Sequence, residues 1–314
     1  MKTKIFIDGR EGTTGLQIDE RLSARDDIEL LTIDPDKRKD PEERRKFINA
    51  ADIVFLCLPD AAAKEAVSLI DPDNDHTAVI DASTAHRVDP AWVYGLPELT
   101  GQKEKIAASK RIANPGCYAT GFITLIRPLI EKGLLSADIK LSAHALSGYT
   151  GAGKKAIAQY EDPDRETELD SPRHYGLGLS HKHLPEMAAV SGLNHKPIFT
   201  PMICDYPQGM VVTVPLCLSE FEQPVTAADV RAAYEEYYAG KPFITVREKE
   251  APVCGFLGAN NMAGKDSLHI FVCGNDEQIV LISRLDNLGK GASGAAVQNM
   301  NILMGCPEDK GLQL

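Results

Sequence analysis

The sequence predicts an α/β protein: a Rossmann-type, doubly wound dinucleotide-binding domain followed by an α+β domain. Two observations predict the first domain. Strand-like and helix-like segments alternate over roughly the first 83 residues, and a glycine-rich turn joins the first strand to the first helix. A third observation predicts the second domain, since strand-like segments beyond about residue 138 follow one another closely, as in a mixed or antiparallel sheet. A chain of 314 residues is long enough for both domains.

The first domain is predicted from a regular alternation. The run DIVFLCLP is apolar throughout and bounded by turn signals, which is typical of a strand buried on both faces of a parallel sheet. Strands are expected at residues 4–8, 28–33, 52–59 and 77–83. Helices are expected at residues 13–24, 41–50 and 61–70. This spacing of strand, helix and strand predicts βαβ units.

The second domain is predicted from a change of pattern. Strands are expected at residues 138–146, 197–206, 209–221, 243–248, 267–274 and 277–285. Helices are expected at residues 122–130, 227–240 and 287–305. We place the dinucleotide-binding domain at residues 1–115 and the α+β domain at residues 116–287, and we expect residues 288–314 to return to the first domain.

Composition narrows the class of protein. With 43% hydrophobic and 25% charged residues the chain resembles an ordinary globular protein, and its net charge of −11 argues against a general nucleic-acid or membrane-surface binder. The start, MKTKIFIDGR, enters a strand-like run at once and does not resemble a signal peptide. No stretch approaches the ~18 apolar residues of a membrane span. We therefore expect a cytoplasmic protein.

Seven cysteines, none spaced as C-x-x-C, indicate a reducing compartment and neither a disulfide framework nor a zinc site. Inert buried thiols are expected inside three strand-like runs, at Cys57, Cys217 and Cys273. Chemical neighbours are not evident for Cys204, Cys254 and Cys306. The seventh, Cys117, has a different context.

The glycine-rich turn follows the first expected strand as G-x-x-G-x-x-G, with Gly9, Gly12 and Gly15. Glycines at this position permit a tight turn and let backbone N–H groups approach a pyrophosphate at the helix N-terminus. A tight turn without a ligand is the alternative. At the end of the second strand, Asp34 favours the ribose of NAD, whereas Arg38 and its lysine neighbours favour the 2′-phosphate of NADP. From the residues alone this choice stays open.

Cys117 lies in NPGCYATG, where a helix is about to begin. A helix N-terminus favours the thiolate, which is the nucleophilic form of cysteine. The preceding Asn-Pro-Gly would hold the thiol in a rigid turn, and neighbouring N–H groups could stabilise an oxyanion. Local evidence leaves two interpretations, a catalytic nucleophile or a small buried residue.

Two histidines in SHKHLPEM, His181 and His183, are candidates for the acid–base partner of the thiol, because imidazole titrates near neutrality. Exposed histidines at a helix start, or half of a metal site, are the alternatives, although His-x-His without further ligands is poor evidence for metal. Arg87 follows the fourth strand at a sheet edge where doubly wound folds bind ligands, so it is a candidate for gripping a phosphate. A solvated surface arginine is the alternative.

Several stretches together resemble the N-acetyl-gamma-glutamyl-phosphate reductase family, and GREGTTG in a compact chain resembles its shorter form. They are ANPGCYATG, YGLPEL, SGYTGAGKK, SHKHLPEM and DNLGKGASGAAVQNMNIL. The resemblance runs from residue 4 to about residue 305. It implies a fold of the semialdehyde dehydrogenase type with a substrate and dimerisation domain, and NADPH-dependent reduction of an acyl phosphate in arginine biosynthesis.

The resemblance also implies roles. Cys117 attacks the γ-acyl phosphate, expels phosphate and forms a thioacyl enzyme, and hydride transfer then yields the semialdehyde. His181 is the implied acid–base residue, with its order relative to His183 open. Implied substrate-binding residues are Arg87, His183 and Asn114. Implied NADP-binding residues are Gly9, Gly12, Thr13, Thr14, Gly15, Arg38, Pro59, Ser83, Ser147, Gly148 and Asn287, the last orienting the nicotinamide carboxamide. No metal site is implied.

Two departures from the family pattern stand out. Asp34 is at odds with a preference for NADP, and GREGTTG lacks the Ser-Gly-Tyr-Thr-Gly that the longer form has at this turn. Aspartate-semialdehyde dehydrogenase is the nearest alternative, but it would have a Cys-x-Asn-Thr turn where this chain has Cys-Tyr-Ala-Thr. A lysine-pathway homologue acting on a carrier-bound substrate and a non-catalytic NADP-sensing module are further alternatives. The expected partners are a small acyl phosphate and further copies of the chain, as a homodimer or homotetramer, and neither nucleic acid nor membrane.

Overall fold

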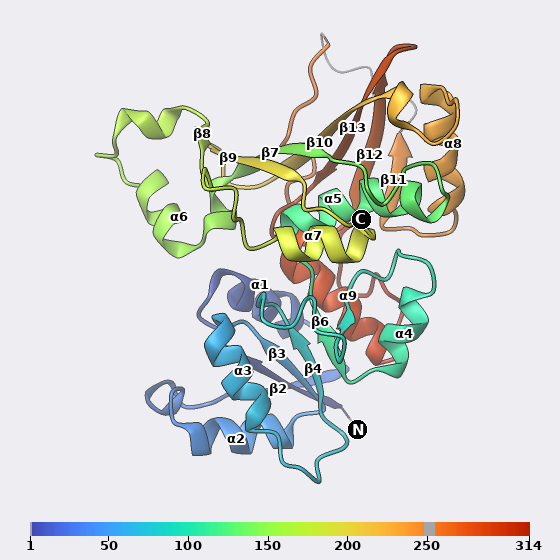
Figure 1. Cartoon of the computed structure of the whole chain (residues 1–314). Helices are drawn as coiled ribbons and strands as arrows, with labels where there is room; N and C mark the ends of the chain where they lie inside the picture. Colours follow the sequence, from blue (N-terminus) through green and yellow to red (C-terminus); the bar gives the residue numbers. More distant parts are fainter. Residues whose placement is uncertain (1, 248–254) are drawn as a thin grey trace. The chain divides into compact units, whose positions relative to one another are not determined.

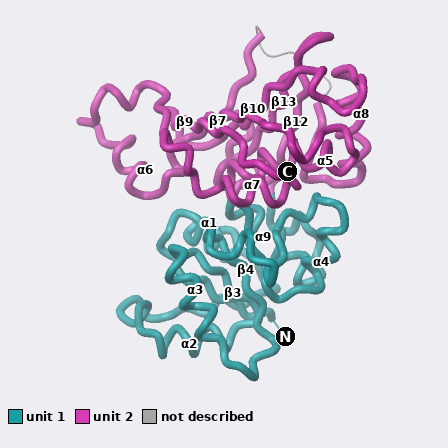
Figure 2. The backbone as a smooth tube through the Cα atoms, in the orientation of Figure 1, with its two compact units in different colours: residues 1–115, 292–312 teal, residues 116–291, 313–314 magenta. Residues whose placement is uncertain are grey.

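The computed structural model of the chain describes residues 2–247 and 255–314. The chain divides into two compact units, which are coloured separately in Figure 2. Unit 1 comprises Met1–Pro115 and Ala292–Leu312, and unit 2 comprises Gly116–Gly291 and Gln313–Leu314. Cys254 and the last residue of the strand expected at 243–248 lie outside the described residues.

Unit 1 is built on a parallel sheet of six strands in its described residues, in the order β2-β1-β3-β4-β6-β5. The strands are β1 (Thr3–Asp8), β2 (Ile28–Leu31), β3 (Ile53–Leu56), β4 (Ala78–Asp81), β5 (Val93–Tyr94) and β6 (Arg111–Ala113). Reversal of the strand order beside β1 makes this a doubly wound sheet. The predicted Rossmann-type fold is confirmed.

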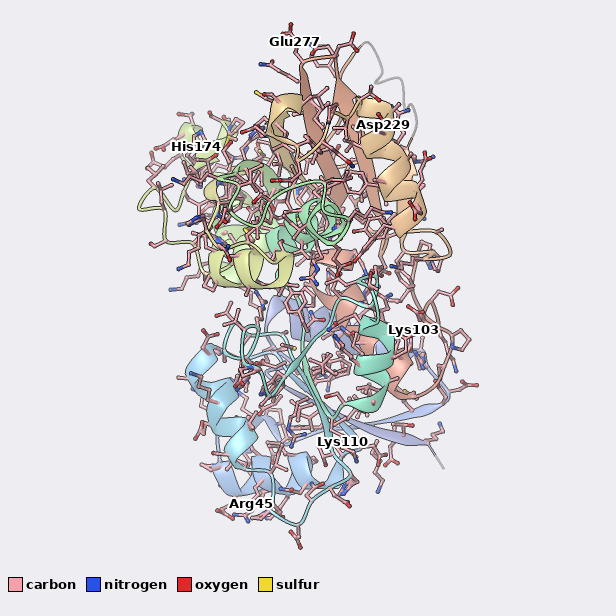
Figure 3. All side chains as sticks on the ribbon, turned by 45° about the vertical axis from the view of Figure 1, so that its right-hand side comes forward. Arg45, Lys103, Lys110, His174, Asp229 and Glu277 are labelled. Carbon is pink, nitrogen blue, oxygen red and sulfur yellow. The ribbon has the colours of Figure 1, made fainter. Side chains whose placement is uncertain are left out.

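Helices join these strands, and their starts follow from local sequence. The helices of unit 1 are α1 (Thr13–Ser23), α2 (Pro41–Ala50), α3 (Asp60–Ser68), α4 (Gln102–Ala108) and α9 (Gly294–Leu303). At α2, Asp40 accepts hydrogen bonds from the N–H groups of Glu42 and Glu43, and Pro41 occupies the first turn, where it needs no N–H partner. Arg44 and Ile48 of α2 are buried, whereas Arg45 points outward (Figure 3) and pairs with Asp71.

The last helix belongs to unit 1 although it comes late in the chain. α9 packs against α1, α4 and β4. A π-helical turn, Gly289–Ser293, precedes it, and the Gly291 N–H donates to the Asp286 carbonyl. The single helix expected at residues 287–305 therefore begins as a wider turn, a feature often found at functional sites.

Unit 2 contains a mixed sheet, as predicted. Its described strands lie in the order β11-β12-β13-β10-β7-β9-β8, with parallel pairs β7/β9 and β11/β12 and antiparallel pairing elsewhere. They are β7 (Ser142–Gly148), β8 (Arg173–His174), β9 (Ile198–Cys204), β10 (Met210–Cys217), β11 (Ile244–Arg247), β12 (Leu268–Gly274) and β13 (Gln278–Leu285).

Helices of unit 2 gather on one face of this sheet. They are α5 (Cys117–Glu131), α7 (Leu184–Ser191) and α8 (Ala227–Tyr237), and α5 packs against β10, β13 and both other helices (Figure 1). A separate excursion carries α6 (Lys154–Tyr160), where the rings of Tyr149 and Tyr160 stack at 4.8 Å. Within the described residues, every helix is too short or too polar to cross a membrane.

Candidate active site

The glycine-rich turn in unit 1 requires its glycines for steric reasons. Gly9 has a φ of +85°, and a Cβ there would lie 2.4 Å from the carbonyl oxygen of Cys57, the residue that follows β3. A Cβ on Gly15 would lie 2.5 Å from the Gly9 oxygen, so this glycine allows α1 to pack closely on the turn. Gly12 is the N-cap of α1, which begins at Thr13 and Thr14. The first turn of α1 contains no acidic side chain, as suits a site for an anion.

A cavity of about 470 Å³ opens beside this turn, within unit 1. Its apolar lining comes from α1, β2 and the segment after β3, including Leu16, Leu30 and Leu58. The cavity also contains Gly9 and Gly12 of the turn. An apolar hollow next to a glycine-rich helix start suits a flat heterocycle with a phosphate at one end.

Charged residues line the mouth of the same cavity. Arg38 forms an ion pair with Glu11 of the glycine-rich turn, and Arg10 pairs with Asp19 at 2.7 Å. Asp34 does not line the cavity. Its carboxylate accepts a hydrogen bond from the Asp36 N–H at 3.0 Å and caps the short helix Pro35–Lys37.

Two further loops of unit 1 follow β3 and β4 and are tied together. Pro59 is the N-cap of α3, and the next residue, Asp60, accepts hydrogen bonds from the Thr84 N–H and hydroxyl at 2.9 and 2.5 Å. The Ser83 hydroxyl donates a hydrogen bond to the Asp81 carboxylate at 2.7 Å. The predicted residues Pro59 and Ser83 therefore lie on loops that Asp60 joins.

The loop after β4 is held by buried Asp81. Its carboxylate lies 2.6 Å from His86 Nδ1, and the His86 ring stacks on Trp92 at 4.1 Å. Arg87, also buried, donates through Nε to the Asn114 carbonyl at 3.0 Å and through a terminal nitrogen to the Ala82 carbonyl at 3.1 Å. Arg87 is therefore a fixed, buried guanidinium and not the solvated surface arginine of the alternative interpretation.

Asn114 is almost fully buried, and its side chain is bonded at both ends. Its Nδ2 donates to the Ala292 carbonyl at 3.0 Å, and its Oδ1 accepts from Asn299 of α9 at 3.3 Å. These bonds give Asn114 a structural role at the end of β6. Its predicted role in substrate binding stays a prediction.

In unit 2, Cys117 is the first residue of α5, which begins five residues before the helix expected at residues 122–130. Gly116 is the N-cap, and its N–H donates to the carboxylate of Glu186 at 3.2 Å. Glu186 is a buried residue of α7 that sequence reasoning missed, although it stands three residues after His183. Gly291 lies against the thiol-bearing residue, since a Cβ on it would be 2.7 Å from Cys117 Cβ.

Aromatic rings pack around the residue next to Cys117. The ring of Tyr118 lies 5.6 Å from that of His181, 5.9 Å from that of His183 and 5.2 Å from that of Phe199. Burial raises the pKa of Tyr118 and of Tyr175, and the neighbouring Cys117 adds to both rises. Both tyrosines are therefore neutral hydrogen-bonding groups at physiological pH.

Hydrogen bonds define the tautomer of the neutral His181 ring. The backbone N–H of His183 donates to His181 Nδ1 at 3.1 Å, and the Tyr175 hydroxyl lies 3.5 Å from His181 Nε2. Because Nδ1 accepts, the proton of the neutral ring is on Nε2. His181 thus presents an N–H donor within the cluster.

The remaining predicted residues of unit 2 lie around the end of β7. Asn287 accepts from the Gly209 N–H at 2.9 Å and donates to Thr150 at 3.0 Å, so its amide holds two loops. Ser147 is buried, and a Cβ on Gly148 would lie 2.5 Å from the Pro207 oxygen. Nowhere in residues 2–247 and 255–314 do three or more His, Cys, Asp or Glu side chains group in a way that could hold a metal ion.

This combination of a doubly wound nucleotide-binding unit and a helix-start cysteine on a mixed-sheet unit agrees with comparisons to known families. Residues 5–108 match the semialdehyde dehydrogenase NAD-binding domain, and residues 117–287 match the semialdehyde dehydrogenase dimerisation domain. The chain therefore belongs to the semialdehyde dehydrogenase family.

Within that family, the chain is similar to proteins named N-acetyl-gamma-glutamyl-phosphate reductase. Those from Brucella suis, Brucella ovis and Brucella abortus are each 51% identical over 97% of this chain and 100% of their own length. The family resemblance predicted from the sequence motifs is confirmed.

Solved structures with this fold are more distant in sequence. Aspartate semialdehyde dehydrogenase II from Vibrio cholerae matches with a TM-score of 0.72 and 18% identity, over 97% of this chain and 99% of that one. The aspartate semialdehyde dehydrogenase from Francisella tularensis matches with a TM-score of 0.71 and 13% identity, over 96% and 100%. At such identities the likeness concerns the fold alone.

Proposed function

We propose that this protein reduces N-acetyl-L-glutamyl 5-phosphate to N-acetyl-L-glutamate 5-semialdehyde with NADPH and releases phosphate, as a step of arginine biosynthesis. The observation that carries the proposal is the position of Cys117, the first residue of α5, beside a cluster that contains His181 and His183. The names of the relatives, at 51% identity over 97% of the chain, support the substrate.

Cys117 provides the nucleophile. Its thiolate attacks the acyl carbon, a carbon–sulfur bond forms, and the bond from carbon to the phosphate oxygen breaks, so that phosphate leaves with the electron pair. The product of this step is a thioester on Cys117. A thiolate suits this intermediate because it is both a good nucleophile and a good leaving group. The start of α5 favours the thiolate.

His181 provides a hydrogen bond to the oxyanion that forms on the acyl carbon. The His183 N–H fixes the neutral ring with its proton on Nε2, and such a donor stabilises negative charge that develops in the transition state. Protonation of Nδ1 would break the bond to His183, so we assign to His181 the role of a hydrogen-bond donor.

The cavity of unit 1 fits an NADP cofactor. Gly9 and Gly15 leave room for close backbone approach, and the helix start lacks acidic side chains. Arg38 and Lys39 line the cavity and would supply the cations that a 2′-phosphate requires. Asp34, the residue that would favour NAD, caps a short helix and does not line the cavity. When bound, the nicotinamide supplies the hydride that the thioester needs.

We also propose that the protein is a homodimer or homotetramer that acts in the cytoplasm. The matched dimerisation domain supports self-association, as do apolar side chains on the face of the unit 2 sheet opposite α5. Half-exposed or exposed residues there include Leu146, Met202, Pro215, Val280 and Ile282. Within the described residues no cysteine forms a disulfide, as suits a reducing compartment. The prediction that Cys217 and Cys273 are buried is wrong, since both are exposed on the sheet face opposite α5.

The reverse reaction tests the function. Purified protein is given N-acetylglutamate semialdehyde, phosphate and NADP, and NADPH absorbance is followed, with aspartate semialdehyde and NAD as alternative reactants and Cys117→Ala as the blank. We expect phosphate-dependent turnover of the acetylated substrate that the blank lacks. Turnover of aspartate semialdehyde alone would transfer the proposal to the sister enzyme. Tight NADP binding without turnover of either substrate would favour the sensing module.

A further inference from the structure

One residue at the mouth of the unit 1 cavity has a charge opposite to the one that a 2′-phosphate requires. Glu11 belongs to the glycine-rich turn, lines the cavity and carries a carboxylate. The same cavity is lined by Arg38 and Lys39, the cations that follow the second strand. The inference below rests on the proposed NADP-dependent function.

Glu11 and Arg38 bind each other across this mouth. Their ion pair joins the turn after β1 to the segment after β2, with side chains that are 62% and 45% exposed. The neighbouring Arg10 is engaged separately, by Asp19 at 2.7 Å. Lys39 forms no ion pair with any residue that the structure describes. Arg38 is thus the guanidinium of the cavity whose partner comes from the glycine-rich turn.

A ligand with a 2′-phosphate must compete for Arg38. A phosphate monoester has close to two negative charges at neutral pH and three strong acceptor oxygens, so it is a better partner for a guanidinium than one carboxylate. The Glu11 carboxylate would then remain beside a dianion, and like charges repel. A ligand with only a 2′-hydroxyl encounters neither the competition nor the repulsion.

We propose that Glu11 is a specificity-determining residue. It forms an ion pair with Arg38 in the ligand-free protein, and its charge repels a 2′-phosphate. Glu11 therefore lowers the preference for NADP over NAD that Arg38 and Lys39 create. The device is an exchange of partners on Arg38, from a protein carboxylate to a ligand phosphate. Because both side chains are about half exposed, the exchange requires no opening of the core.

Direct binding tests the proposal without relying on turnover. The dissociation constants of NADPH and NADH are measured by nucleotide fluorescence for the wild type, Glu11→Gln, Arg38→Ala and the double variant. The matched control is Glu20→Gln, which removes the same charge from an exposed position of α1 outside the cavity. Melting temperatures establish that each variant is folded.

E11Q should tighten NADPH binding about 5-fold and change NADH binding by less than about 2-fold. R38A should weaken NADPH binding about 10-fold or more and leave NADH unaffected. In the R38A background, E11Q should bring a smaller gain, because no guanidinium is left to release. E20Q should change neither constant.

The two proposals fail in different ways. If R38A weakens NADPH binding but E11Q leaves it unchanged or weakens it, the role of Glu11 is overturned and the NADP proposal stands. If the wild type binds NADH as tightly as NADPH and R38A changes neither, the NADP proposal itself is overturned, and the inference about Glu11 with it.

Discussion

The two regions that sequence motifs identify are built in opposite ways. The cavity of unit 1 is edged by ion pairs, of which Glu11–Arg38 has both side chains about half exposed. The cluster next to Cys117 in unit 2 consists of packed rings, with Tyr118, His183 and Phe199 all buried. Exposed ion pairs contribute little free energy and exchange partners easily, whereas packed rings have few alternative arrangements. One region suits a charged ligand that binds and leaves, and the other suits groups that must stay aligned.

Substitutions in the two regions are also expected to differ in the size of their effects. Substitution in the ring cluster removes contacts that nothing replaces, because a close-packed interior relaxes little. Substitution at the cavity mouth alters electrostatics that solvent partly screens. We therefore expect the largest effects in unit 2 and the smallest at the ion pairs of unit 1.

Modification of Cys117 is the largest expected effect. Alkylation by iodoacetamide at neutral pH should lower turnover by about 10³-fold or more, because the nucleophile is lost. Burial raises the pKa of Cys57 to about 12, so this thiol stays protonated and should react slowly. Mass spectrometry of a time course follows each cysteine. Activity should fall in step with labelling of Cys117 and at the same rate in the control variant Cys217→Ser, which removes an exposed cysteine. Full activity with labelled Cys117 would refute its role.

His181 gives the next largest effect and a test of its protonation. His181→Ala should lower kcat about 10²- to 10³-fold, the usual loss for one oxyanion donor. His181→Gln places an N–H donor near the position of Nε2, whereas His181→Asn places it near that of Nδ1. We expect Gln to retain activity within about 10-fold of the wild type and Asn to behave like Ala. Equal loss in all three variants would indicate a base, because an amide cannot accept the thiol proton.

The sequence predicts the fold best where elements are long and periodic. The strands β1 and β3 and the helices α1 and α2 lie close to their expected places. Buried parallel strands have a strong local signal, α1 follows a glycine-rich turn, and α2 has an Asp N-cap with Pro in its first turn. The short elements β5, β6 and α4 of unit 1 were not predicted, since two or three residues of strand or two turns of helix depend on tertiary partners and not on local pattern.

The site was predicted unevenly for a related reason. Cys117 was found because a turn motif precedes it in the chain, and Gly9 because its spacing to Gly12 and Gly15 is visible. Glu186 and Tyr175 were missed, since only the fold brings α7 and the loop before it against the start of α5. The proton position on His181 depends on a backbone N–H, for which residue identity has no signal.

Gly9 is an exception within unit 1, because we expect a large effect from a substitution at this position. Gly9→Ala combines a positive φ with a backbone clash, so we expect the free energy of unfolding to fall by about 2–4 kcal/mol and NADPH to bind about 10-fold or more weakly. The matched control is Gly101→Ala, which also has a positive φ but open space around its Cβ, and should cost about 1 kcal/mol without affecting NADPH. Urea unfolding and nucleotide titration measure both. Equal losses of stability and of NADPH affinity in the two variants would show that the close approach of Gly9 to Cys57 is not required.

The smallest expected effect concerns a partly exposed ion-pair group in unit 1. Asp27 accepts hydrogen bonds from Arg25 and Lys310, and these partners lower its pKa below the ordinary value. A carboxyl whose pKa is lower in the folded than in the unfolded chain stabilises the fold above its unfolded pKa of about 3.9, and that contribution disappears as pH falls through the folded pKa. Asp27→Asn should therefore cost about 1 kcal/mol at pH 7 and progressively less below about pH 4. The control is Asp26→Asn at the neighbouring exposed position. The free energy of unfolding of each variant is measured by urea unfolding at pH 7 and at a pH below about 4. If Asp27→Asn lowers the free energy of unfolding equally at both pH values, Asp27 stabilises the fold through packing and not through its charge.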